Sequence, residues 1–171
     1  MTDPALARLN ALPIAEAEAA LLHCLGAARW ARAMAARRPF PSRESLFAAG
    51  DELCASLDRQ DWLEGFSRHP KIGEKRAAAE TSSTERRWAE QEQSAATRAV
   101  DRTLAALTEA NRAYLARFGY IFIVCATGKS AEEMLALLRQ RLQNDPDAEL
   151  RVAAEEQRRI ARLRLEKLLA P

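Results

Sequence analysis

The chain has 171 residues, of which 48% are hydrophobic and 29% are charged, and its 26 Lys and Arg residues nearly balance its 24 Asp and Glu residues. This length and composition predict a single domain, residues 1–171, that buries a core without disulfides or a structural metal, and they exclude a largely disordered protein. Positive and negative residues alternate along the chain, which argues against nucleic acid as a partner.

The cysteines and the apolar runs bear on metal binding, cellular compartment and membrane insertion. Cys24, Cys54 and Cys125 are far apart and lack the spacing of a metal site. The odd number of cysteines and the lack of a cleavable hydrophobic leader favour a reducing compartment. The terminal residues "LLAP" are not a peroxisomal Ser-Lys-Leu address, so we expect the cytoplasm. The run "YIFIVCA", residues 120–126, is too short to cross a bilayer. We therefore expect no metal and no membrane partner.

Helical composition and helix-ending residues predict four helices in the first part of the chain. They are residues 12–25, ended by Gly26; residues 29–38, ended by Pro39; a helix capped by Ser42; and a short helix capped by Asp58 around Trp62. The stretch "SRHPKIGEK", residues 67–75, follows. Pro70 and Gly73 prevent a regular helix there, so this stretch is predicted to be a loop that carries one of the two histidines.

Capping boxes mark the remaining helices. The predicted elements are a helix that begins near residue 83, after Ser82 and Glu85; a helix ending at Gly119; a helix over 131–143, opened by Ser130 and Glu133; and a long last helix after Asp145 and Pro146. Residues 120–129 have aromatic and β-branched side chains without a helical period. They predict a short, buried, extended segment near 120–126 in an otherwise all-α, multi-helix bundle.

Glu92 lies within an apolar stripe when the helix around Trp88 is drawn at about 100° per residue. The stripe contains Ala95, Ala96 and Ala99, whereas Glu90 points the opposite way. A carboxylate on an inward face has a partner or a raised pKa, both of which are common in functional sites. A structural ion pair or a solvated face is the alternative interpretation.

Arg164 also lies on the inward face of its helix, the last one, at the centre of a stripe that includes Ala153, Gln157 and Ile160. Arginine in this position can extend to solvent, form a structural pair, or bind an anionic group. His69, in the loop before Pro70, has a side chain whose unperturbed pKa suits proton transfer near neutral pH. Together these residues suggest acid/base chemistry on a small anionic substrate without a cofactor.

Six blocks of sequence resemble one known family, the 2-oxo-4-hydroxy-4-carboxy-5-ureidoimidazoline (OHCU) decarboxylases of urate degradation. The blocks are "LNALP", "RPF", "HPKIG", "WAEQEQSAA", "NRAYLARFGYIFIVCATGKSAEEMLALLRQRLQND" and "ELRVAAEEQRRIARLRLEKLL". The resemblance covers nearly the whole chain. It implies an all-α fold, often dimeric, that converts OHCU to (S)-allantoin without metal or organic cofactor, in a pathway with urate oxidase and 5-hydroxyisourate hydrolase.

The resemblance also implies roles for particular residues. His69 and Pro70 match the catalytic His-Pro pair of the family, and Glu92 and Gln93 match its Glu-Gln pair, with Glu92 catalytic. The remaining substrate-binding positions are Ala89, the backbone of Phe122, Ile123, Val124, Cys125 and Ala126, and Arg164, which matches the arginine of the closing "RL" motif.

Ala89 departs from the family pattern, which has a serine hydroxyl at this position. Loss of one hydrogen-bond donor typically weakens a site by about 0.5–1.5 kcal/mol. Two alternatives to OHCU decarboxylation therefore stay open: a catalytically weakened helical module that binds another protein, and a decarboxylase of a related ureido acid.

Overall fold

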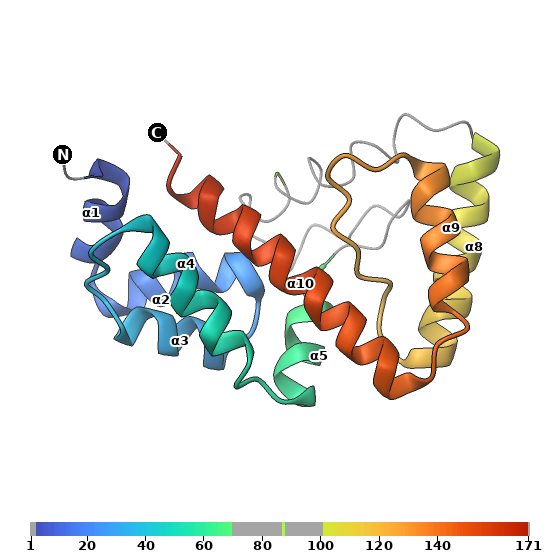
Figure 1. Ribbon diagram of the computed structural model, residues 1–171, viewed down its shortest axis with the longest axis horizontal. Helices are drawn as coiled ribbons and strands as arrows, with labels where there is room; N and C mark the ends of the chain where they lie inside the picture. Colours follow the sequence, from blue (N-terminus) through green and yellow to red (C-terminus); the bar gives the residue numbers. More distant parts are fainter. Residues whose placement is uncertain (1–2, 70–86, 88–100, 171) are drawn as a thin grey trace. The chain divides into compact units, whose positions relative to one another are not determined.

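A computed structural model describes residues 3–69, 87 and 101–170 of the chain. These residues form helices and no β-strand, which confirms the predicted all-α class (Figure 1). The helices are α1 (Pro4–Ala11), α2 (Ile14–Leu25), α3 (Ala28–Ala36), α4 (Arg43–Cys54), α5 (Arg59–Ser67), α8 (Asp101–Phe118), α9 (Ala131–Arg141) and α10 (Pro146–Leu168).

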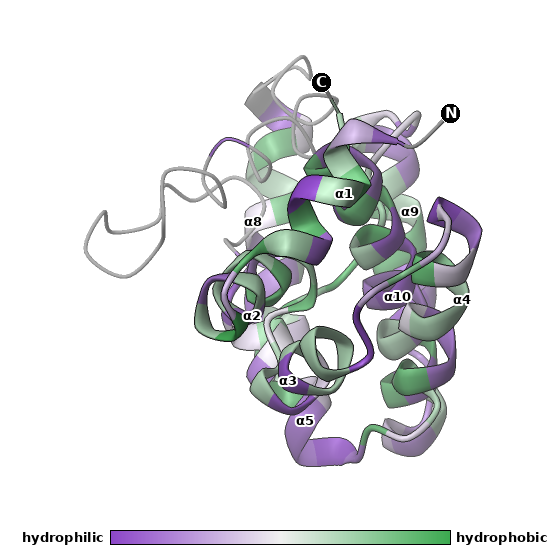
Figure 2. Cartoon of the chain, turned by 90° about the vertical axis from the view of Figure 1, so that its left-hand side faces the viewer, coloured by the Kyte–Doolittle hydropathy of each residue, from purple (hydrophilic) through white to green (hydrophobic). Residues whose placement is uncertain are grey.

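The chain divides into two compact units. The first, called here the N-terminal unit, comprises Met1–Gly65 and Arg158–Pro171, and the second, the central unit, comprises Phe66–Gln157. Helix α10 therefore contributes its first half to the central unit and its second half to the N-terminal unit. The described helices are amphipathic, with hydrophobic and hydrophilic residues interspersed along each one (Figure 2). None of them combines the length and apolarity that crossing a bilayer requires.

The core of the N-terminal unit is organised around Trp30 on α3, whose side chain is 1% exposed. Its indole Nε1 donates to the carbonyl oxygen of Gly50 on α4 at 3.1 Å. A Cβ atom at position 50 would lie 3.4 Å from Leu165 of α10 and 3.5 Å from the indole ring. These are ordinary van der Waals distances, so α4 packs directly against both neighbours at this position.

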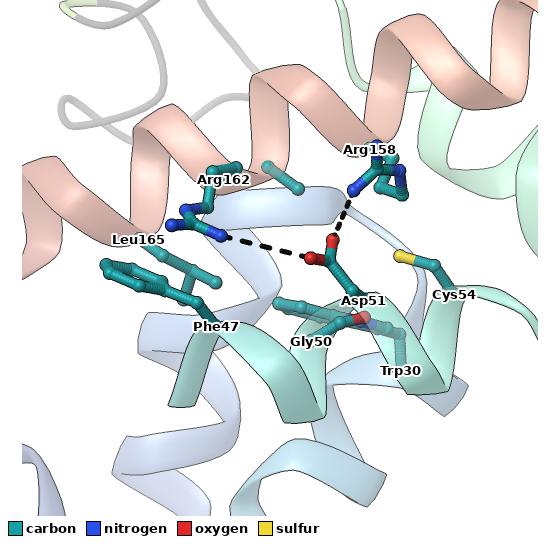
Figure 3. Close-up of a pocket in the computed structure, with 9 residues that line it drawn as sticks. Trp30, Phe47, Gly50, Asp51, Cys54, Arg158, Arg162 and Leu165 are labelled. Atoms are coloured by element: carbon teal, nitrogen blue, oxygen red, sulfur yellow. Dashed lines mark hydrogen bonds and ion pairs between the residues drawn. The ribbon is translucent and has the colours of Figure 1, made fainter. Parts of the chain in front are cut away.

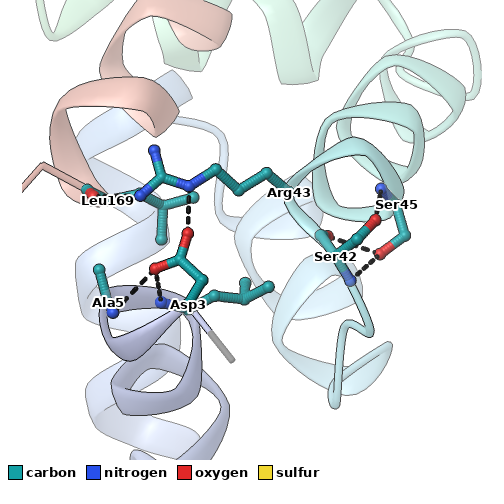
Figure 4. A network of polar contacts seen from close by, with 7 residues as sticks. Asp3, Ala5, Ser42, Arg43, Ser45 and Leu169 are labelled. Carbon is teal, nitrogen blue, oxygen red and sulfur yellow. Dashed lines mark hydrogen bonds and ion pairs between the residues drawn. The ribbon is translucent and has the colours of Figure 1, made fainter. Parts of the chain in front are cut away.

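Asp3 joins three elements of this unit (Figure 4). Its Oδ1 accepts from the backbone N–H groups of Ala5 and Leu6, which caps α1. Its Oδ2 pairs with Nε of Arg43 at the start of α4, and Arg43 Nη2 donates to the carbonyl oxygen of Leu169, just past α10, at 2.9 Å. One carboxylate thus fixes the start of α1 against α4 and the end of α10.

The ends of several helices are where the sequence predicts them. Gly26 ends α2 with a φ of 89°, a left-handed conformation that glycine adopts without strain. Four predicted capping residues also bond the first turns of their helices, which confirms them as caps. They are Ser42 on α4, Asp58 on α5, Ser130 with Glu133 on α9, and Asp145 on α10.

Two features differ from the predictions. Helix α1 was not predicted, although Asp3 followed by Pro4 is the same N-cap and N1 signal that correctly predicts α10 at Asp145 and Pro146. The buried stripe of α10 also includes Glu149, which lies one turn before Ala153 and is fully buried although it is charged.

The central unit packs α8 against α9. Tyr114 and Phe118 of α8 form an aromatic cluster with Tyr120 and Phe122, and ring centroids in this cluster lie between 4.7 and 6.2 Å apart. Gly119, with a φ of 81°, ends α8 and lets the chain turn into the segment that carries the last two of these rings. The segment over 120–126 is not helical and is largely buried, as predicted.

Candidate functional site

His69 lies two residues past the end of α5, in the central unit. Its side chain is half-buried, and its backbone N–H donates to the carbonyl oxygen of Phe66 at 3.1 Å. The Phe66 ring is 1% exposed and packs on the Tyr120 ring with centroids 5.1 Å apart. The structure therefore brings the beginning of the predicted His-Pro loop next to the beginning of the segment over 120–126.

The five predicted backbone-contact residues, 122–126, form one buried strip of chain outside any helix. Phe122, Ile123, Val124 and Ala126 are at most 8% exposed, and Cys125 is half-buried. Buried backbone N–H and C=O groups need partners, and here side chains supply several of them. We call residues 122–126 the binding segment.

Three side chains bond the backbone of the binding segment. Arg141 Nη1 donates to the carbonyl oxygen of Ile123 at 2.7 Å. Glu156 Oε2 accepts from the N–H of Cys125 at 2.7 Å, and Lys129 Nζ donates to the carbonyl oxygen of Cys125 at 2.9 Å. The path of the segment is thus set by charged side chains from α9, α10 and the turn before α9.

Arg141 itself belongs to a buried network. Its guanidinium forms an ion pair with Glu149, with Nη2 2.6 Å and Nε 2.7 Å from Oε1, and the two side chains are 7% and 0% exposed. Glu149 also accepts from the Tyr114 hydroxyl and, at 2.8 Å, from Asn144 Nδ2. Burial raises the pKa of Tyr114, and its hydrogen bond to Glu149 raises it further. The phenol therefore stays protonated and donates.

Arg164 is 4% exposed in the N-terminal unit, which confirms its predicted inward orientation. Its Nη1 donates to the carbonyl oxygen of His23 on α2 at 3.2 Å. The neighbouring Cys24 thiol is fully buried, and burial raises its pKa to about 12, partly opposed by the positive charge of Arg164. Cys24 is therefore a neutral thiol at physiological pH.

The other predicted site residues lie outside the described part of the chain: Pro70, Ala89, Glu92 and Gln93. The inward orientation of Glu92, and the convergence of His69, Glu92 and Arg164, accordingly stay predictions. Among the described candidates, His69 and the binding segment belong to the central unit, and Arg164 belongs to the N-terminal unit.

Sequence reasoning did not single out Arg141 and Glu149, yet a signal for both was present. Arg141 follows Met134 and Leu138 at intervals of seven and three residues, so it lies on the apolar face of α9. Glu149 precedes Ala153 and Gln157 at steps of four on α10. Opposite charges on the inward faces of two successive helices predict a buried pair.

A small surface pocket in the N-terminal unit contains none of the predicted site residues (Figure 3). Asp51 of α4 lies there, 2.6 Å from Arg158 and 3.9 Å from Arg162 of α10. The Arg162 guanidinium also lies 4.0 Å from the centroid of the Phe47 ring. These contacts join α4 to α10 and fill the pocket, so we assign it a structural role.

Known proteins similar to this chain agree on one family. The family model described as OHCU decarboxylase matches residues 10–166. A crystal structure of OHCU decarboxylase in the presence of (S)-allantoin has 36% sequence identity to this chain and a TM-score of 0.74, and the match covers 88% of this chain and 96% of that one.

Two curated relatives are also similar. The 2-oxo-4-hydroxy-4-carboxy-5-ureidoimidazoline decarboxylase of Amia calva is 33% identical over 77% of this chain and 75% of its own length. The uric acid degradation bifunctional protein TTL of Arabidopsis thaliana is 37% identical over 86% of this chain, which spans 45% of that protein. The extent of the family match, the identity and the shared all-α fold together show that the chain belongs to the OHCU decarboxylase family.

Proposed function

We propose that this protein decarboxylates OHCU to (S)-allantoin in urate degradation, without a metal or organic cofactor. The observation that carries the proposal is the 36% identity to an OHCU decarboxylase structure over 96% of that structure's chain. The family match crosses the boundary between the two units, at residues 10–166, and supports treating the whole chain as one functional domain.

The substrate itself explains why no cofactor is needed. OHCU carries a carboxylate and a hydroxyl on one ring carbon and a ureido group on the next. Breaking the bond to the carboxylate releases CO2 and leaves an electron pair that the conjugated imidazoline ring accepts. Delivery of a proton to one face of the ring then sets the chirality of allantoin.

His69 is proposed to act on the substrate hydroxyl or to deliver this proton. Its position at the end of α5, where the backbone bond to Phe66 and the packing of Phe66 on Tyr120 fix the start of the loop, supports this role. A positioned acid or base contributes on the order of 10² to 10⁴ in rate. Glu92 is the second proposed catalytic residue, and Gln93 is proposed to hold ureido or ring nitrogens.

The binding segment is proposed to contact the substrate through its backbone. Because the N–H of Cys125 already donates to Glu156, a ligand must use other backbone groups of residues 122–126. Arg164 is proposed to bind an anionic group of the substrate, and its burial and charge support this role.

The test generates OHCU in place from urate, with urate oxidase and 5-hydroxyisourate hydrolase, and follows its ultraviolet decay and the circular dichroism of the allantoin formed. We expect the wild-type protein to accelerate the decay and to yield the S enantiomer. His69→Ala should remove most of this acceleration. An unchanged decay rate with wild-type protein would refute the proposed function.

The assignment of Glu92 has a matched control in Glu90, two residues away in the same sequence block. Glu92→Gln should lower kcat strongly, whereas Glu90→Gln should leave it near the wild-type value. Equal effects of the two substitutions would contradict the inward orientation predicted for Glu92.

Ala89 offers a test of the weakened-enzyme alternative. If the missing hydroxyl limits this enzyme, Ala89→Ser should raise kcat/KM by up to about tenfold, the equivalent of one hydrogen bond. A wild-type protein that is inactive and stays inactive after this substitution would favour the interaction module. Turnover of another ureido acid in preference to OHCU would favour the related decarboxylase.

A cytoplasmic homodimer with a functional link to urate oxidase and 5-hydroxyisourate hydrolase completes the proposal. The resemblance to a family that is often dimeric supports the dimer, and the free cysteines at 24, 54 and 125 are consistent with a reducing compartment. Light scattering on the purified protein measures the oligomeric state, and cell fractionation locates the protein. A monomer, or recovery outside the cytoplasmic fraction, would overturn the corresponding part.

A further inference from the structure

We propose that Arg141 is a positioning residue for the decarboxylation: held by Glu149, it fixes the carbonyl of Ile123 and thereby the substrate-facing backbone of the binding segment. This inference rests on the proposed function, because it assigns a role to the backbone that is proposed to contact OHCU. It adds to the active site a buried ion pair that lies behind the backbone instead of facing the substrate.

The binding segment needs an external holder because it belongs to neither a helix nor a strand. In a helix, the backbone groups of the same element fix one another; over 121–126 this regular ladder is missing. The carbonyl of Ile123 is buried, and Arg141 donates to it at 2.7 Å. The orientation of this peptide unit therefore depends on a side chain from α9.

The geometry of Arg141 suits this task. Its Nη1 reaches Ile123, while its Nε and Nη2 face one carboxylate oxygen of Glu149 at 2.7 and 2.6 Å. The guanidinium also lies 4.5 Å from the centroid of the Phe122 ring, the preceding residue of the segment. A planar fork makes these contacts at once, whereas the ammonium of lysine is a single point on a flexible stem.

Glu149 in turn is held by hydrogen bonds to both of its carboxylate oxygens. Its Oε1 accepts hydrogen bonds from the Tyr114 hydroxyl and from Arg141, and its Oε2 accepts one from Asn144 Nδ2 at 2.8 Å. Glu149 is fully buried, so these charge-assisted bonds form away from competing water. The network therefore holds Arg141 in one position before any substrate arrives.

Holding the segment should affect binding more than chemistry. The proposed acid/base residue, His69, follows α5, and its backbone is anchored through Phe66 rather than through Arg141. A contact that binds the substrate and the transition state equally well raises KM and leaves kcat nearly unchanged when it is weakened. Loosening Ile123 should therefore raise KM while leaving kcat closer to the wild-type value.

The test compares Arg141→Lys with Arg139→Lys, the same substitution at an exposed position of the same helix. The readouts are KM and kcat with OHCU generated in place, the hydrogen exchange of a peptide covering 120–126, and the melting temperature. For Arg141→Lys we expect KM to rise about tenfold or more with kcat changed less, and faster exchange over 120–126. Arg139→Lys should match the wild type in KM and in the exchange over 120–126.

A stability control separates positioning from general weakening. Leu107→Ala truncates a fully buried side chain on α8 and should lower the melting temperature without raising KM. An equal rise of KM in Leu107→Ala would overturn the positioning role, and so would a folded Arg141→Lys protein with wild-type KM and exchange.

Two further outcomes are decisive. If Arg141→Lys does not fold, the deciding variant is Lys129→Met, which removes the half-buried hydrogen bond to the carbonyl of Cys125. A KM raised several-fold would support control of the binding segment by side chains. An unchanged KM would overturn that control. If the wild-type protein is inactive on OHCU, the proposed function and this inference both fail. An active wild-type protein with unchanged KM in the folded variant refutes the inference alone.

Discussion

Two Arg-carboxylate clusters of this protein have the same shortest N–O distance in different surroundings. In the central unit, Arg141 and Glu149 approach to 2.6 Å with side chains 7% and 0% exposed. In the N-terminal unit, Arg158 and Asp51 also approach to 2.6 Å, but their side chains are 36% and 38% exposed. The distance is the same, so the difference in consequence must come from water.

Folding removes the water around both charges of the buried pair, which costs free energy. The attraction between the two charges offsets this cost, together with the hydrogen bonds to Tyr114, Asn144 and the carbonyl of Ile123. Removing either Arg141 or Glu149 leaves the other charge buried without its counter-ion. The Arg158–Asp51 pair is partly exposed, so it keeps part of its hydration and is screened by salt. Contact distance alone therefore says little about what an ion pair contributes.

The largest effect is expected for Glu149→Ala, which leaves Arg141 buried without its carboxylate. The free energy of unfolding should fall by about 3–5 kcal/mol, measured by urea denaturation. The double variant Arg141→Met with Glu149→Leu should recover most of this loss, because it removes both charges. A loss below about 1 kcal/mol in the single variant would contradict the comparison.

Tyr114→Phe should have the next largest effect, since it keeps the ring of the aromatic cluster and removes the hydroxyl that donates to Glu149. Hydrogen bonds to charged groups contribute roughly 1.5–3 kcal/mol, and we expect a loss in this range by thermal and urea unfolding. An unchanged stability would mean that the other donors to Glu149 suffice.

Asp51→Asn should change stability by less than about 1 kcal/mol, although Asp51 faces both Arg158 and Arg162 (Figure 3). Because the pairs are partly exposed, any difference from the wild type should shrink further in 1 M salt, where the Debye length is about 3 Å. A loss as large as that of Glu149→Ala would show that exposure does not decide the outcome.

The smallest effect is expected for Asp3→Asn and should depend on pH. The hydrogen bond from Arg43, followed by that from the Leu6 N–H, lowers the pKa of Asp3 from 3.8 to about 2. A carboxyl with a lowered folded-state pKa stabilises the protein above its unfolded pKa, and this contribution disappears as the pH falls from about 4 towards 2.

Asparagine preserves the N-cap of α1, so Asp3→Asn removes the charge and the acceptor for Arg43 while keeping the cap. The denaturation midpoint of the variant should be lower than that of the wild type at pH 5 and approach it at pH 2. A difference that is the same at both pH values would assign the effect to the cap and not to the pair with Arg43.

The sequence alone determined the helical class, most helix ends and the inward orientation of Arg164. These features depend on local rules: Gly26 adopts a positive φ, Ser130 bonds the first turn of its helix, and a period of 3.6 residues places position 164 on the apolar face. The blocks around His69 and Glu92 identified the family and the proposed chemistry.

Only the tertiary structure showed which buried charges meet and which backbone groups they hold. Arg141 and Glu149 come from different helices, and their pairing, as well as the bond from Arg141 to Ile123, depends on how α9, α10 and the binding segment pack. Local patterns describe one element at a time, so they place Arg141 and Glu149 on inward faces but cannot show that the two side chains meet. The exclusion of water, which separates this pair from the Arg158 pair, is a property of the packed core.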